Sequence, residues 1–136
     1  MTQENKELLL KDLCTRSFYG VMCDRLGQAK KLLSVSPDKL YCIELDNGEY
    51  TPSKYKVEDV KPYLRPMSSM TEEEKKEWHD TFDSVQDYVP EADDYDDNWH
   101  EQPGIESYDW LNEHHFDYRG LIPMGLALEA LEGMYK

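Results

Sequence analysis

The chain has 136 residues, of which 39% are hydrophobic and 32% charged, and its formal net charge at pH 7 is −14. This length suffices for one domain with its own core, and ten tyrosines and three tryptophans supply bulky apolar surface. The composition therefore argues against a disordered protein, and the negative charge argues against direct binding to nucleic-acid backbones or anionic membranes.

The charge is divided unevenly along the chain. Residues 1–66 carry eleven Lys or Arg and ten Asp or Glu, a net +1, whereas residues 67–136 carry four and nineteen, a net −15. Such an excess attracts basic proteins, cations, or sites that normally receive nucleic acid.

Cysteine usage and the absence of targeting signals indicate the compartment. Cys14, Cys23 and Cys42 show no CxxC spacing, and the chain has neither a secretory signal nor an apolar run long enough to span a bilayer. A reduced, cytoplasmic location is therefore expected.

The first half predicts one helix followed by strands. Leucines alternate with charged residues over residues 4–14, which predicts a short amphipathic helix. Residues 19–26 and 29–36 then predict two strands separated by a turn around Gly27. The helix is expected to cover one face of the sheet.

A hairpin is the clearest local signal of the first half. Residues 41–45 alternate apolar and polar side chains and lead into Asn47-Gly48, which predicts a two-residue turn with Leu45 facing Tyr50. Residues 57–64 predict a last edge strand limited by prolines. Together these segments predict a small twisted antiparallel sheet of four or five strands, with curling toward a barrel as one option.

The second half opens with a capping box. Thr71 to Glu74 have the Thr-x-x-Glu form that starts a helix. The predicted helix runs to Pro90, because four apolar residues follow at helical spacing: Trp78, Phe82, Val85 and Val89. Its opposite face is predicted to carry a row of carboxylates from Glu73, Asp80, Asp83 and Asp87.

The remaining segments complete an α+β fold in a single domain, residues 1–136. Residues 90–104 are acidic and without periodicity, which predicts a surface loop. Residues 105–115 are expected to be helical, with His115 as a hydrogen-bonded packing residue and His114 solvated. The apolar tail over residues 121–131 predicts a short helix or turn against the core.

Metal and catalytic signatures are weak. Asp94, Asp96 and Asn98 occupy three EF-hand positions, but Trp99 stands where that loop needs glycine and Ile105 where it needs glutamate. The histidines lack zinc-site spacing, and the chain has no GxSxG elbow, P-loop or GxGxxG. We therefore expect neither a metal nor a cofactor, and no enzymatic activity.

The acidic helix and loop are the predicted functional surface. Carboxylates in a row can occupy a groove built for phosphates, and aromatic side chains within an acidic loop are typical contact anchors. One alternative is a charged face that only keeps the protein soluble. Another is that Tyr95 and Trp99 tether the loop to the core instead of contacting a partner. The predicted partner-binding residues are six aspartates and one tryptophan: Asp80, Asp83, Asp87, Asp94, Asp96, Asp97 and Trp99.

Two stretches carry a resemblance to a known group of proteins. They are Val60-Lys-Pro-Tyr-Leu-Arg-Pro-Met-Ser-Ser-Met-Thr71 and the segment from Trp110-Leu-Asn through His115-Phe-Asp-Tyr-Arg-Gly-Leu-Ile122 to Glu132-Gly-Met-Tyr135. These motifs resemble a family of small uncharacterised proteins of Bacteroides-group gut bacteria and their phages. The family pattern has proline where this chain has Leu131. The resemblance implies an origin on phage or mobile-element DNA in a bacterial cytoplasm, and it assigns no catalytic residues.

Three function hypotheses remain. The first is a non-enzymatic binding protein that presents its acidic second half to a basic protein surface, as an inhibitor or nucleic-acid mimic directed at a host defence enzyme, anti-CRISPR activity included, or at a nucleic-acid-processing enzyme. The second is a phage accessory or regulatory protein that self-associates through its apolar tail. The third is a metal-dependent hydrolase built on His100, His114 and the acids.

Overall fold

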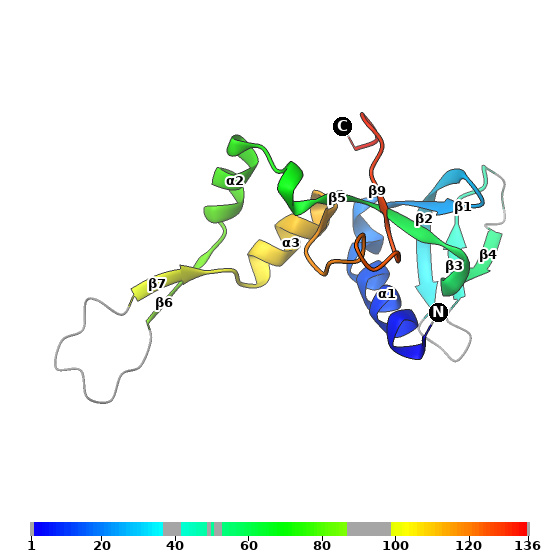
Figure 1. Cartoon of the computed structure of the whole chain (residues 1–136), viewed down its shortest axis with the longest axis horizontal. Helices are drawn as coiled ribbons and strands as arrows, with labels where there is room; N and C mark the ends of the chain where they lie inside the picture. The colour runs from blue at the N-terminus through cyan, green and yellow to red at the C-terminus, as the bar shows by residue number, and fades with distance from the viewer. Residues whose placement is uncertain (1, 37–41, 49, 51–52, 87–98, 136) are drawn as a thin grey trace. The chain divides into compact units, whose positions relative to one another are not determined.

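A computed structural model describes residues 2–36, 42–48, 50, 53–86 and 99–135 of the chain (Figure 1). They form two compact units: unit 1 is Met1–Ser69 with Asn112–Lys136, and unit 2 is Met70–Leu111. The chain leaves unit 1 after Ser69 and returns to it at Asn112. That residues 1–136 form a single domain stays a prediction. Each unit is considered by itself below.

Unit 1 contains a seven-stranded mixed sheet. The strands β1 to β4 form an antiparallel meander, β5 pairs antiparallel with β1, and two short strands, β8 and β9, pair parallel with β5. Their bounds are β1 Met22–Arg25, β2 Gln28–Ser36, β3 Cys42–Leu45, β4 Ser53–Lys56, β5 Lys61–Pro66, β8 Phe116–Asp117 and β9 Leu128–Glu129. Three 3₁₀ turns flank these strands: η1 Ser17–Tyr19 precedes β1, η2 Val57–Asp59 connects β4 to β5, and η3 Met67–Ser69 follows β5.

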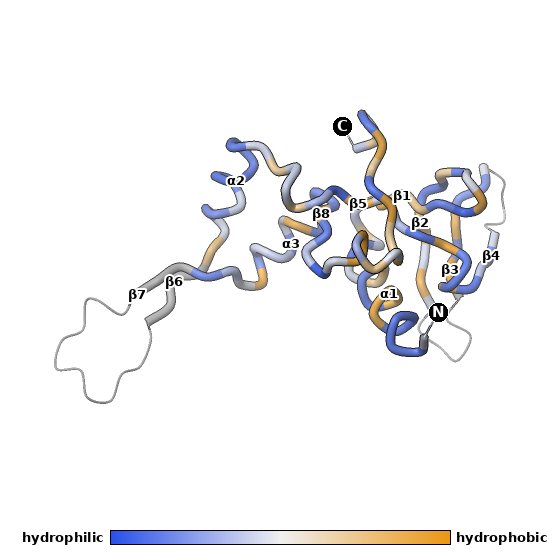
Figure 2. Tube along the Cα trace, viewed as in Figure 1, coloured by the Kyte–Doolittle hydropathy of each residue, from blue (hydrophilic) through white to orange (hydrophobic). Residues whose placement is uncertain are grey.

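Helix α1, Gln3–Arg16, begins at a side-chain cap and supplies one wall of the core. Thr2 accepts a hydrogen bond from Asn5 N at 3.1 Å, which satisfies a backbone donor of the first turn. Leu9, Leu10 and Leu13 are buried, and the hydropathy colouring shows apolar residues among the polar ones of α1 (Figure 2). They pack with residues from the sheet and from the tail: Val21, Cys23, Leu32, Ile43, Leu45, Val57, Val60, Leu64, Leu121, Leu126 and Ala127.

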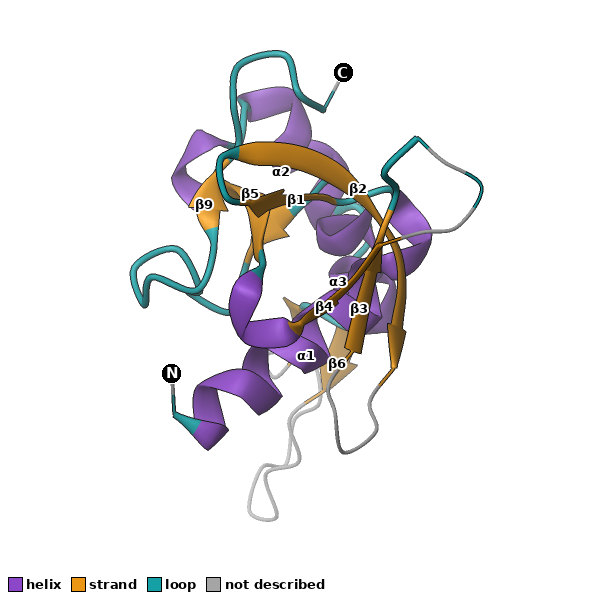
Figure 3. Cartoon of the chain, turned by 90° about the vertical axis from the view of Figure 1, so that its right-hand side faces the viewer, coloured by secondary structure: helices purple, strands orange, loops and turns teal. Residues whose placement is uncertain are grey.

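The α+β class is confirmed, but two details of the predicted sheet are wrong. The sheet is mixed and open (Figure 3), because residues of the C-terminal part add the parallel strands β8 and β9. Strand β5 is not at an edge: it lies between β1 and β8, and Pro62 is opposite Cys23 within the ladder. The tail over residues 121–135 forms turns and the strand β9, which agrees with the turn, and not the short helix, of the two predicted alternatives.

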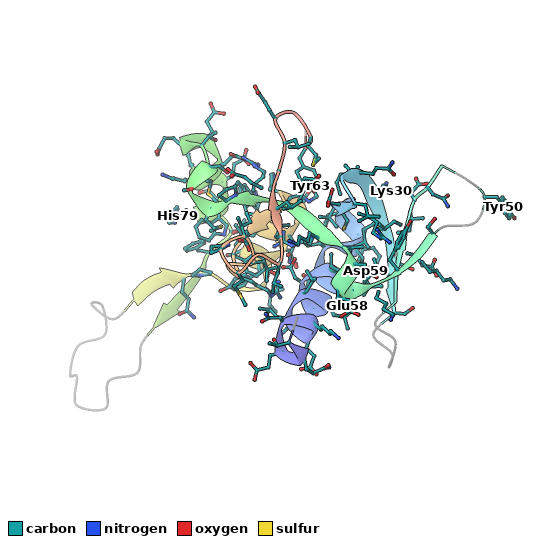
Figure 4. The ribbon with its side chains drawn as sticks, turned by 45° about the vertical axis from the view of Figure 1, so that its right-hand side comes forward. Lys30, Tyr50, Glu58, Asp59, Tyr63 and His79 are labelled. Carbon is teal, nitrogen blue, oxygen red and sulfur yellow. The ribbon has the colours of Figure 1, made fainter. Side chains whose placement is uncertain are left out.

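The predicted hairpin between β3 and β4 exists, but its turn is longer than two residues. Leu45 pairs with Ser53 and not with Tyr50. Gly48 has a φ of 77° and donates its N–H to Asp46 Oδ1 at 2.9 Å, so the aspartate side chain closes a local turn instead of the strand ladder. Tyr50 is fully exposed and points away from the fold (Figure 4).

Unit 2 contains α2 Glu72–His79, a two-stranded antiparallel ladder of β6 Asp83–Gln86 and β7 Trp99–Gln102, and most of α3 Ile105–Glu113. The predicted helix, which runs to Pro90, is therefore wrong over residues 80–86, and its last residues lie outside the described part of the chain. The ladder sets Asp83 opposite Gln102 and Gln86 opposite Trp99, so part of the predicted loop over residues 90–104 is strand.

Candidate functional site

The charge asymmetry of the chain coincides with the division into units. Unit 2, residues 70–111, has fifteen acidic residues and two lysines, a formal net charge of −13. Unit 1 has fourteen acidic and thirteen basic residues, a net −1. Thirteen of the fourteen net negative charges of the protein therefore fall within 42 consecutive residues.

Helix α2 is built to hold acids in its first turn. Thr71 Oγ1 accepts from Glu74 N at 3.1 Å, and Glu74 Oε1 accepts from Thr71 N at 3.0 Å, which completes the capping box. The positive end of the helix dipole favours the carboxylates that follow Thr71. The sequence prediction of this helix start is confirmed.

Most carboxylates of α2 are exposed and not neutralised. Glu72 lies 3.3 Å from Lys75 Nζ in a solvent-exposed pair. Glu73, Glu77 and Asp80 are exposed and have no ion-pair partner within the described part of the chain. Because exposed pairs contribute little, these side chains leave a strongly negative surface.

Helix α2 ends early because of a contact with a residue far away in the sequence. Thr81 Oγ1 donates to Trp78 O at 2.5 Å, and Ser107 Oγ donates to Thr81 O at 3.0 Å. A hydroxyl that bonds the preceding turn competes with helix continuation. Beside this turn, the Phe82 ring packs edge-on against Trp78, with ring centroids 4.9 Å apart.

Helix α3 shows an amphipathic pattern within unit 2. Ser107, Trp110 and Leu111 are buried. The opposite side is exposed, with Ile105 80% and Tyr108 45% accessible. Two exposed acids lie next to these apolar side chains: Glu106 and Asp109.

The structure places only part of the predicted partner-binding set. Asp80 is exposed at the C-cap of α2, and Asp83 and Trp99 lie in β6 and β7. The predicted single helical row that includes Asp83 is wrong, because the helix ends before it. Four of the predicted residues lie outside the described part: Asp87, Asp94, Asp96 and Asp97.

Metal ligation finds no support in the described ranges. No group there of three or more His, Cys, Asp or Glu side chains could hold a metal ion. The EF-hand-like aspartates fall outside those ranges, and His100 lies in β7. Among the same residues no helix is both long and apolar enough to cross a bilayer.

Unit 1 holds a buried ionic cluster that the sequence did not reveal. The side chains of Asp12 and Arg16 are both 0% exposed, and Arg16 Nε lies 2.9 Å from Asp12 Oδ2. Arg119 Nη1 donates to the other oxygen, Asp12 Oδ1, at 2.9 Å, and Arg16 Nη2 donates to Phe116 O at 2.6 Å. Each carboxylate oxygen of Asp12 therefore accepts a hydrogen bond from an arginine.

The cluster continues through neutral side chains. Arg119 Nη1 also donates to Tyr118 Oη at 2.6 Å, and that hydroxyl donates to Asn112 Oδ1 at 2.9 Å. A second carboxylate, Asp117, accepts hydrogen bonds from the N–H groups of Leu121 and Ile122, both at 2.9 Å.

The ionic cluster around Asp12 connects α1 to the segment after α3, and its burial indicates a role in stability. The one local signal was that Asp12 and Arg16 share the leucine stripe of α1 at i, i+4 spacing.

His115 packs beneath the C-terminal tail. It has a φ of 63° and follows the end of α3, and its ring stacks on Tyr135 with centroids 3.8 Å apart. Its Nδ1 is buried without a partner among the described atoms, which corrects the prediction of a hydrogen-bonded residue. Burial, with the nearby Arg16 guanidinium, lowers the pKa of His115 to about 4.

The two thiols that the structure describes, Cys14 and Cys23, are poorly suited to nucleophilic chemistry. Burial raises the pKa of the Cys23 thiol to about 12, with Asp12 and Asp24 adding to the effect. Partial burial also raises the pKa of Cys14. Since the thiolate is the reactive form, neither cysteine is activated.

The lowered pKa of His115 predicts loss of stability in mild acid. The unfolded imidazole takes up a proton near pH 6.5, whereas the folded one does so only near pH 4. The neutral His115 side chain therefore leaves the free energy of unfolding unaffected by pH above 6.5. As the pH falls from 6.5 toward 4, that free energy decreases by on the order of 2 kcal/mol after allowance for solvent screening.

This dependence is measured by urea unfolding of wild type and His115→Asn between pH 4 and 8. Asparagine tolerates positive φ and does not titrate. The wild-type free energy of unfolding should fall more steeply below pH 6.5, and the two curves should run parallel above pH 7. Equal slopes over the whole range would contradict the prediction.

Comparison with known proteins adds no relative to this description. The sequence matches no protein-family model, and no curated protein or solved structure is significantly similar to it. The class defined here is an α+β protein with an open mixed sheet and a separate acidic unit.

Proposed function

We propose that this chain is a non-enzymatic binding protein that presents acidic unit 2 to a basic surface on a partner protein. The observation that carries the proposal is the segregation of charge, with −13 in unit 2 and −1 in unit 1. A charge kept only for solubility has no need to gather in one folding unit. Complementary charge speeds encounter and selects partners of opposite sign.

The partner class follows from the chemistry of the surface. Proteins that handle nucleic acids carry basic grooves for phosphates, and exposed carboxylates such as Glu73, Glu77 and Asp80 can compete for such grooves. The resemblance to phage and mobile-element proteins suggests a host defence or nucleic-acid-processing enzyme as target. The protein would then act as an inhibitor by occupancy.

Self-association through the tail has less support. Leu121, Leu126 and Ala127 are buried in the core of unit 1, so most of the apolar surface of the tail is already used. Met124 and Leu131 are the large hydrophobic side chains of the described tail that remain exposed. A tail truncation would remove part of the core along with any interface.

Charge reversal in unit 2 tests the proposal. The variant Glu73→Lys/Glu77→Lys/Asp80→Lys should capture the basic partner from a bacterial host lysate at least tenfold less well than wild type. Capture by wild type should also fall as salt rises, because the interaction is screened.

The matched control carries the same change of net charge in unit 1. Glu4→Lys/Glu7→Lys/Asp59→Lys alters three exposed acids and should leave capture close to wild type. Equal losses in both variants would indicate a non-specific charge effect. Unchanged capture by the unit 2 variant would refute the proposal.

A further inference from the structure

We propose that the exposed face of α3 in unit 2 is a docking surface for a basic amphipathic segment of the partner. This inference rests on the proposed function and specifies it: the partner element carries an apolar residue beside its Lys and Arg. The juxtaposition that carries it is an apolar pair, Ile105 and Tyr108, beside two carboxylates, Glu106 and Asp109.

Helical geometry arranges these four side chains on one surface. At about 100° per residue, Ile105, Tyr108 and Asp109 lie within roughly 100° of arc, and Glu106 borders the same arc. Ile105 and Tyr108 are neighbours at i, i+3 spacing, so together they form one exposed apolar patch, called the ledge below. The buried residues Ser107, Trp110 and Leu111 fall on the other side.

The start of α3 is held in place by hydrogen bonds, so this ledge is preformed. Ser107 Oγ accepts from Gly104 N at 3.2 Å and donates to Thr81 O at 3.0 Å. A rigid surface loses less conformational entropy on binding than a flexible one. Ile105 and Tyr108 are therefore displayed at fixed positions.

The composition of the face selects its occupant. Carboxylates alone can match the charge of a phosphate-binding groove. The exposed Ile105 calls for an apolar residue on the partner in addition to its basic residues. Burying Ile105 and the Tyr108 ring against an apolar side chain contributes free energy that salt does not screen. The flanking acids, in a unit of net charge −13, require positive charge on the partner. A basic amphipathic helix meets both requirements.

Two synthetic peptides of equal positive charge serve as probes. One is a helical peptide of lysine and leucine with leucines at i, i+3 and i+4 spacing, and the other is an oligolysine. With the full wild-type chain, isothermal titration should show tighter binding of the lysine–leucine peptide. That advantage should persist in 1 M salt, where the Debye length is about 3 Å. Equal affinity for the two peptides would overturn the inference.

Variants then assign the surface. Ile105→Ala/Tyr108→Ala should weaken the lysine–leucine peptide at least tenfold and leave oligolysine unchanged. The control Phe18→Ala/Leu26→Ala removes two side chains of unit 1 that are 93% and 85% exposed, and it should leave both affinities unchanged. Equal weakening by control and test variants, or none by the test variant, would overturn the inference.

The charge variant separates this inference from the proposed function. Glu73→Lys/Glu77→Lys/Asp80→Lys should weaken both peptides at low salt. If it does so while Ile105→Ala/Tyr108→Ala has no effect, the acidic unit binds basic ligands but α3 is not the docking face. If it weakens neither peptide, the proposed function itself fails.

Discussion

Replacing Asp12 with asparagine is expected to lower the free energy of unfolding by about 3–5 kcal/mol. Asp12 is fully buried and its two oxygens accept from Arg16 and Arg119. Loss of the negative charge leaves the guanidinium of Arg16, which is 0% exposed, without its counter-ion. The penalty is that of an uncompensated buried charge.

Urea unfolding followed by far-UV circular dichroism measures this effect, since urea does not screen charges. All three tryptophans lie in unit 2, so their fluorescence reports that unit separately from the site of the mutation. The control is Glu58→Gln, which breaks the exposed 3.0 Å pair with Lys6 and should barely move the midpoint. Similar midpoints for the Asp12 variant and the control would contradict a structural role for the cluster.

The same cluster shows what sequence reasoning could and could not find. The leucines of α1 and the caps at Thr2 and Thr71 are local features, and local patterns predict helix starts well. Arg119, however, is 107 residues from Asp12 and meets it only in the folded unit. Asp12 and Arg16 are fully buried on the leucine side of α1 because partners distant in the sequence satisfy their charges.

The end of α2 illustrates a different limit. The spacing of Trp78, Phe82, Val85 and Val89 fits a helix, and no proline occurs between Thr71 and Pro90. The structure ends the helix at His79 because Thr81 bonds back to Trp78 and is anchored by Ser107. Ser107 is 26 residues away from Thr81, so the periodic pattern of apolar residues could not predict that the helix ends at His79.

The two parallel strands, β8 and β9, could not be predicted from the sequence because they are too short. β8 and β9 have two residues each, too few for an alternating pattern. Their positions depend on pairing with β5, where Arg65 N donates to His115 O at 2.7 Å and Ala130 N to Leu64 O at 2.8 Å. The prolines in β5 predicted a strand at the edge of the sheet. In the structure β8 and β9 both pair with β5, so it lies inside the sheet.

Tyr135 makes the most informative of these tail contacts, and Tyr135→Phe is expected to lower the free energy of unfolding by on the order of 2–3 kcal/mol. The Tyr135 hydroxyl donates to Tyr63 O at 2.6 Å and accepts from Met22 N at 2.9 Å, so it bridges β5 and β1. Phenylalanine keeps the ring stacked on His115 but leaves a backbone acceptor and a backbone donor without partners.

Tyr63→Phe is the matched control, because it removes one hydroxyl that donates to the Asp24 side chain at 3.2 Å in a part-buried position. Its expected cost is about 1 kcal/mol or less. Urea unfolding at pH 7 should therefore place Tyr135→Phe clearly below Tyr63→Phe in midpoint. Amide exchange should also accelerate at Met22, whose N–H loses its acceptor. If both variants unfold at the same midpoint with Met22 still protected, the strands hold together without the tail, and the C-terminal residues contribute packing alone.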